Sequence, residues 1–150
     1  MTIRRFVLMS AFRLSMIWDL LTTFLGTLIL LNSISFISLG ISLVGTLTVG
    51  AFNFATKSIW QARNPRGMEL ILLKSAWILA IAFDFWTSLT CNATYVALGY
   101  FEIGGGFDFG TLFATLNISQ ILIVVFVTII ATLGPMLVGY IRDRDLDFLA

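Results

Sequence analysis

Four long apolar stretches dominate this sequence of 150 residues, and they restrict its possible folds more than any other feature. They run from about Val7 or Leu14 to Leu31, Ile34 to Ala55, Leu72 to Gly99 and Ile118 to Ile141. A bilayer core about 30 Å thick requires roughly 20 mostly apolar residues per helix. The sequence therefore predicts an all-α integral membrane protein, with four transmembrane helices packed as a bundle.

The composition excludes several classes of protein. Hydrophobic residues make up 59% of the chain and charged residues 11%, whereas a soluble domain carries about 25% charged residues. The net charge of +1 and the absence of a basic run give no sign of nucleic-acid binding. With no histidine and a single cysteine, Cys91, the chain lacks the usual imidazole ligands and a Cys-His nucleophile. We expect no metal, no cofactor and no enzymatic activity.

The basic residues predict the orientation, because Lys and Arg concentrate in cytoplasmic segments. All nine fall on one side of the four predicted spans, and the other side has only the acidic residues Glu102 and Asp108. The nine are Arg4, Arg5, Arg13, Lys57, Arg63, Arg66, Lys74, Arg142 and Arg144. We therefore expect an inner or plasma-type membrane protein with both termini in the cytoplasm. Its single domain would comprise a hairpin at 7–55, a cytoplasmic loop at 56–71, a second hairpin at 72–141 and a tail at 142–150.

A polar stripe occurs twice within the apolar stretches. The first stripe is Asp19, Thr22, Thr23, Gly26 and Thr27, and the second stripe is Asp84, Thr87, Ser88, Cys91 and Asn92. Both have the offsets i, i+3, i+4, i+7 and i+8, which place five residues on one helix face. This pattern favours two similar helical hairpins, arranged as parallel repeats about an axis along the membrane normal.

The carboxylates of the two stripes are the main functional candidates. At 1.5 Å per residue, Asp19 and Asp84 lie about 18 and 22 Å from the outer membrane boundary, and hence inside the hydrocarbon region. An ionised Asp there costs at least about 2.5–3.5 kcal/mol, so both should face protein or water. The candidate ion or proton site comprises Asp19, Thr22, Thr23, Asp84, Thr87, Ser88 and Asn92. Alternatively, both carboxyls are neutral and lock helices together through hydrogen bonds to the neighbouring hydroxyls.

The second and fourth stretches carry seams of small residues, which allow membrane helices to approach closely. The expected helix-packing residues are Ser38, Ser42 and Gly45, with Asn53 on the same seam, and Ala131, Pro135 and Gly139. Such seams favour a non-enzymatic subunit that lies in the lipid bilayer and forms a homo-oligomer or joins other membrane subunits. The competing hypothesis is a proton or cation channel or transporter, built within one bundle or at an oligomer axis. An intramembrane Asp–Asp hydrolase is a third possibility that no other residue supports.

Overall fold

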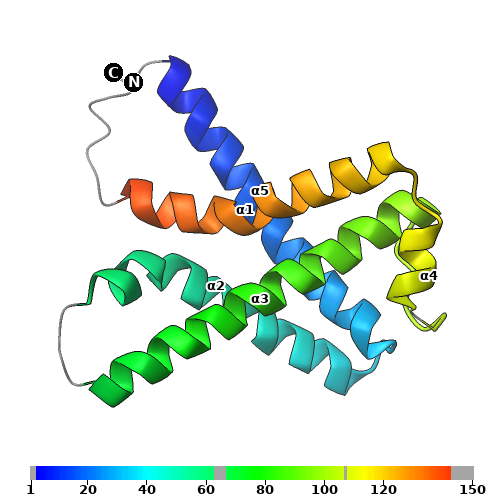
Figure 1. Ribbon diagram of the computed structural model, residues 1–150, viewed down its shortest axis with the longest axis horizontal. Coiled ribbons are helices and arrows are strands. Elements are labelled where there is room, and N and C mark those ends of the chain that lie inside the picture. The colour runs from blue at the N-terminus through cyan, green and yellow to red at the C-terminus, as the bar shows by residue number, and fades with distance from the viewer. Residues whose placement is uncertain (1–2, 63–66, 107, 143–150) are drawn as a thin grey trace.

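The computed structural model describes residues 3–62, 67–106 and 108–142, and in that part of the chain every regular element is a helix. The elements are α1 (Ile3–Leu31), α2 (Phe36–Gln61), α3 (Gly67–Leu98), α4 (Phe109–Ala114) and α5 (Ile118–Arg142) (Figure 1). Each of the four long helices contacts the other three. They cross one another instead of running side by side along their whole lengths (Figure 1). The prediction of an all-helical chain is confirmed.

Three of the helices are long and apolar enough to cross a membrane: α1, α2 and the segment Ile118–Tyr140 of α5. α3 has 32 residues but is not among these three. It carries Lys74 and Asp84, and nearly every residue from Thr87 to Thr94 has a hydroxyl, thiol or amide side chain. Those polar side chains are buried within the chain, so the helix that departs most from a simple apolar span is the one that contributes most to the polar interior.

The helix ends differ from the predicted boundaries. α2 continues to Gln61 and α3 begins at Gly67, so most of the segment expected as a loop at 56–71 is helical. Arg63, Arg66, Arg144 and all of the predicted tail beyond Arg142 lie outside the described residues. The α1–α2 connection is a tight turn, as expected: Asn32 has a left-handed φ of 51°, and Ser35 caps α2 in a capping box with Ser38.

α4 is an element that the sequence did not predict. Asp108 caps its first turn by accepting hydrogen bonds from the Gly110 amide, at 3.2 Å, and from the Thr111 hydroxyl. The hydrogen bond from Thr111 lowers the pKa of the exposed Asp108 carboxyl. Phe109 and Phe113 of α4 pack against a small apolar cluster that is formed by Leu89, Ala93, Leu116 and Val124. This cluster joins α4 to the adjacent ends of α3 and α5.

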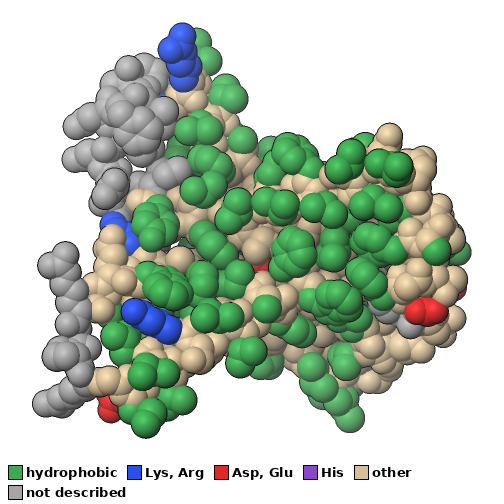
Figure 2. All heavy atoms as spheres, viewed as in Figure 1, with side chains coloured by type: hydrophobic (Ala, Val, Ile, Leu, Met, Phe, Trp, Pro, Cys, Tyr) green, Lys and Arg blue, Asp and Glu red, His purple; other side chains and the backbone are tan. Residues whose placement is uncertain are grey.

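The distribution of side chains is the reverse of that in a soluble protein. Among the described residues, polar side chains outnumber apolar ones in the fully buried set, and large apolar side chains are exposed on all four long helices. Figure 2 shows apolar side chains spread over most of the visible face. A surface of this kind is stable against lipid tails and unstable in water.

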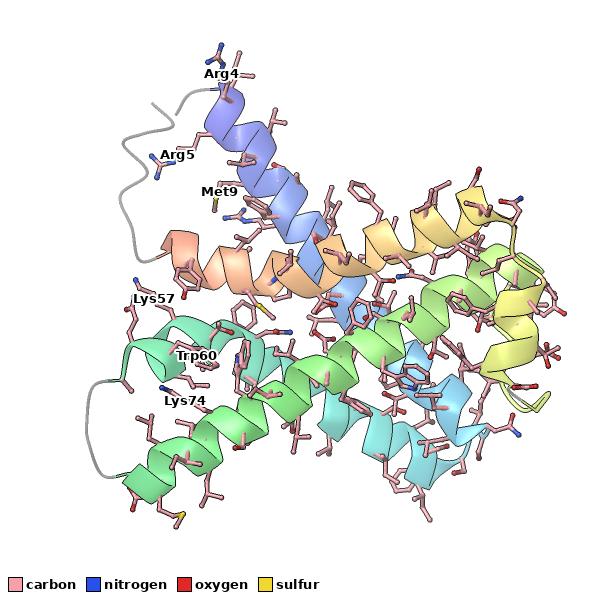
Figure 3. The ribbon with its side chains drawn as sticks, viewed as in Figure 1. Arg4, Arg5, Met9, Lys57, Trp60 and Lys74 are labelled. Carbon is pink, nitrogen blue, oxygen red and sulfur yellow. The ribbon has the colours of Figure 1, made fainter. Side chains whose placement is uncertain are left out.

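Basic side chains gather at one end of the molecule, where α2 ends and α1 and α3 begin (Figures 2 and 3). Arg4 and Arg5 lie on the first turns of α1, and Lys57 and Lys74 lie on either side of Trp60 (Figure 3). The Lys74 ammonium is 5.0 Å from the centroid of the Trp60 ring, within the range of a cation–π contact. Lys57, Lys74 and Trp60 thus combine the charge and the aromatic surface found where membrane helices meet the aqueous interface.

Candidate functional site

The two polar stripes face each other inside the chain, at the crossing of α1 and α3. All ten of their residues are buried. The hydroxyls of Thr22 and Ser88 are 2.8 Å apart, and the Thr23 hydroxyl donates to Asp84 Oδ1 at 2.6 Å. The sequence left open whether each stripe faces the other or a neighbouring subunit, and these contacts place them against each other within one chain.

Gly26 allows the two helices to approach this closely. A Cβ atom added at Gly26 would lie 2.6 Å from the carbonyl carbon of Thr87, and closer still to its oxygen. Because this obstacle is backbone, no side-chain rotation could relieve it. The small residue in the first stripe therefore sets the separation of α1 and α3.

Asp84 is held at both of its carboxyl oxygens. Oδ1 accepts from Thr23 of α1, and Oδ2 accepts from the Asn53 side-chain amide of α2 at 2.8 Å. The carboxyl is completely buried. Donors from two other helices therefore fix its position. Asn53 was predicted only as a packing residue, since helical spacing within α2 could not show which neighbour its amide would meet.

Asp19 has a different environment, although it begins a stripe of the same pattern. Its side chain is 1% exposed, and neither carboxyl oxygen has a hydrogen-bond partner among the described residues. Asp84 is close enough for its charge to act on Asp19. Burial of an ionised carboxylate without a donor is costly, and a second negative charge nearby opposes it further.

Asn92, the last residue of the second stripe, connects three helices. Its side-chain oxygen accepts from the Trp18 indole at 3.2 Å, and its amide donates to the Thr128 hydroxyl of α5 at 3.1 Å. Thr87, by contrast, bonds within α3, to the carbonyls of Phe83 and Asp84. The candidate site residues are thus all buried in the interior, but their side chains form separate hydrogen-bonded groups, and the described contacts give the Asp19 carboxyl no partner.

The small-residue seams also face the chain's own interior. Ser38, Ser42, Ala131 and Pro135 are buried, and Gly45 and Gly139 are half-buried. A Cβ atom at Gly139 would lie 3.1 Å from the Phe54 carbonyl oxygen of α2, and one at Gly45 would lie 3.8 Å from the Phe83 ring of α3. Helix packing within one chain accounts for both seams, which leaves little of them exposed for contact with another subunit.

A cavity of about 240 Å³ lies at the end of the molecule opposite the basic residues. Asn32, Thr94, Leu98, Glu102, Gly105, Gly106, Asp108, Thr111, Leu112 and Thr115 line it. The Gly106 amide donates to the Asn32 side chain at 3.1 Å, which links the α1–α2 turn to the loop before α4. Within the described ranges, no group of three or more His, Cys, Asp or Glu side chains could hold a metal ion.

Comparisons of the chain with models of known protein families, with curated proteins and with solved structures give no significant match. A buried pair of carboxyls, one with two donors and one with none, can bind and release a proton or another small cation.

Proposed function

We propose that this chain is a non-enzymatic integral membrane protein that moves protons or monovalent cations across the bilayer through the Asp19–Asp84 pair. In this proposal the basic end is cytoplasmic, in an inner or plasma-type membrane, and α3 crosses the bilayer as a fourth span. Two points support a spanning α3. It is 32 residues long, and its polar side chains are turned inward where α1, α2 and α5 satisfy or surround them.

The observation that carries the proposal is the unpartnered carboxyl of Asp19. Polar groups at membrane depth are costly, and those that persist there face a bundle interior or a hydrated cavity and mark ion or proton pathways. A carboxyl that served only to lock helices would need donors or acceptors on its neighbours. Asp84 has such partners, whereas both oxygens of Asp19 are buried without one in the described part of the chain.

The subunit hypothesis loses its main support in the structure. It rested on seams of small residues as surfaces for assembly, and those seams are largely used inside the chain. A homo-oligomer or a complex with other membrane subunits stays an alternative proposal. It is also the expected explanation if the protein alone moves no ions.

The test is a flux measurement on the purified protein, reconstituted alone in liposomes. Proton flux and monovalent cation flux are each recorded for the wild type and for the double variant Asp19→Asn, Asp84→Asn. We expect the double variant to fall to the level of protein-free liposomes, because an amide can neither take up a proton nor neutralise a cation. The matched control is Glu69→Gln, which makes the same carboxyl-to-amide change at an exposed position on α3 and should retain flux.

Two results would contradict the proposal. One is the absence of any flux from folded, correctly oriented wild-type protein. The other is a double variant with wild-type flux, which would show that ions pass without the carboxyls. The first result would direct attention to partner subunits, and the second to a path that avoids the α1–α3 crossing.

A further inference from the structure

The two stripes repeat in sequence but not in their contacts. Ser88 occupies the position in the second stripe that Thr23 occupies in the first. If the repeat were exact, Ser88 would bond to Asp19 just as Thr23 bonds to Asp84. Instead the Ser88 hydroxyl pairs with Thr22 at 2.8 Å, and Asp19 is left without a donor among the described residues.

The other helices increase this difference. Asn53 of α2 supplies Asp84 with a second donor. In the described part of the chain no side chain of α2, α3 or α5 hydrogen-bonds to the Asp19 carboxyl. The nearby hydroxyls of α1 do not reach it either, since Thr23 donates to Asp84 and Thr27 donates to the Thr23 carbonyl.

The ionisable groups on the neighbouring helices do not offset the charge of Asp19. Those with described side chains are Lys57 on α2, Glu69, Lys74, Asp84, Cys91 and Tyr95 on α3, and Tyr140 on α5. Of these, the charge that acts on Asp19 is that of Asp84, and it is repulsive. Among the described residues, the Asp19 carboxyl therefore has no hydrogen-bond donor, whereas the Asp84 carboxyl has two.

From these contacts we infer that the two carboxyls have unequal roles: Asp19 takes up and releases the proton, and Asp84 is a fixed acceptor that Thr23 and Asn53 position beside it. The inference rests on the proposed function and specifies the ion as a proton. On uptake an O–H bond of a hydronium ion breaks as one O–H bond forms on an Asp19 oxygen, and on release that bond breaks as the proton returns to a water molecule. A multivalent metal ion would need more oxygen ligands than this pair provides, and no third acidic or metal-binding side chain joins it within the described residues.

Infrared spectroscopy of the purified protein tests this assignment without measuring transport. A protonated carboxylic acid has a carbonyl stretching band that is separate from the bands of carboxylates and amides. Carboxylic acids in water are ionised at neutral pH, because their reference pKa values are about 4. A protonated-acid band at neutral pH therefore comes from a buried carboxyl.

We expect this band in the wild type, its loss in Asp19→Asn and its retention in Asp84→Asn. Asp19→Glu keeps a carboxyl at the position and should restore the band at a shifted frequency, so the test does not depend on Asp19→Asn alone folding normally. Asn53→Ala, which removes a donor from Asp84 only, should leave the Asp19 band in place. Circular dichroism confirms that each variant is helical before its spectrum is compared.

A band that disappears in Asp84→Asn but persists in Asp19→Asn would overturn the assignment, and so would the loss of the band in both variants. A wild-type protein without the band would also overturn it. These outcomes are distinct from failure of the proposed function. A protonated-acid band from Asp19 without any flux would contradict the transport proposal but support the assignment of the proton to Asp19. Flux that requires both carboxyls, together with a band from Asp84, would support transport but contradict the assignment.

Discussion

Asn53 and Thr23 reach Asp84 from two different helices, and this convergence decides how the site is built. Each contributes one hydrogen bond, at 2.8 and 2.6 Å, to a different oxygen of the same carboxyl. Hydrogen bonds to a charged group are stronger than those between neutral groups. In an interior of low dielectric constant, loss of one donor also leaves a buried acceptor unsatisfied.

Replacement of Asn53 by alanine should therefore destabilise the protein by about 0.6–2 kcal/mol, the range found for interhelical hydrogen bonds between membrane helices. Reversible unfolding in mixed detergent micelles, followed by circular dichroism, measures the change. Ser58→Ala is the matched control because Ser58 lies on the same helix and is exposed. If the two variants had equal stability, the Asn53–Asp84 bond could not be a significant part of the fold.

The residues at the α1–α3 crossing also show what the sequence could and could not predict. The spacing of the two stripes placed five residues on one face of each helix, and the structure buries all ten. Spacing cannot show which of two equivalent hydroxyls turns towards a carboxyl, because that choice depends on rotamers and on a third helix. The pairing of Ser88 with Thr22, and with it the isolation of Asp19, was therefore not predictable from the repeat.

At the scale of elements, the long helices were predictable and the short one was not. Length and hydropathy predicted the four long helices from the four apolar stretches. They did not predict where the helices end, because a helix can extend beyond its apolar core into polar sequence, as α2 does from Thr56 to Gln61. α4 has six residues, too few to show a helical period. Its formation depends on Asp108 as a cap and on the packing of Phe109 and Phe113 against side chains of α3 and α5.

The contact between α1 and α3 leads to a prediction about Gly26. In Gly26→Ala the new methyl group would meet the Thr87 carbonyl. The helices must then separate, and the hydrogen bonds that join Thr22 and Thr23 to α3 must lengthen. We expect destabilisation of about 1–3 kcal/mol, the usual cost of overpacking a close contact, together with loss of flux. Detergent unfolding and the liposome assay measure the two effects.

Gly40→Ala is the control for this change. Gly40 lies within helix α2, and a Cβ atom there meets nothing within 4 Å, so alanine should be neutral or stabilising because it favours a helix more than glycine does. Equal stability of the two variants would contradict the close approach of α1 and α3 at Gly26.

At the scale of the whole molecule, a polar interior lies beneath an apolar surface, and basic residues lie at one end. In lipid this arrangement is favourable only if each helix that carries interior polar groups is shielded by the others. α3 carries Asp84 and is packed by α1, α2 and α5. If α3 crosses the bilayer, its C-terminal end lies on the opposite side of the membrane from the C-terminal end of α2. If α3 does not cross, these two helix ends lie on the same side.

Cysteine labelling in intact cells distinguishes these two topologies. Cys91 is completely buried, so the wild-type chain should not react with a membrane-impermeant maleimide and provides a clean background. Gln61 and Glu102 are exposed, at the end of α2 and just after α3 respectively. If α3 spans the bilayer with the basic end inside, Glu102→Cys should react in intact cells, and Gln61→Cys should react only after permeabilisation.

Labelling of both variants before permeabilisation, or of both only afterwards, would mean that α3 does not cross the bilayer. The Asp19–Asp84 pair could not then lie on a path through four spans. Labelling of Gln61→Cys alone in intact cells would keep the four spans but reverse the orientation that the basic residues predict.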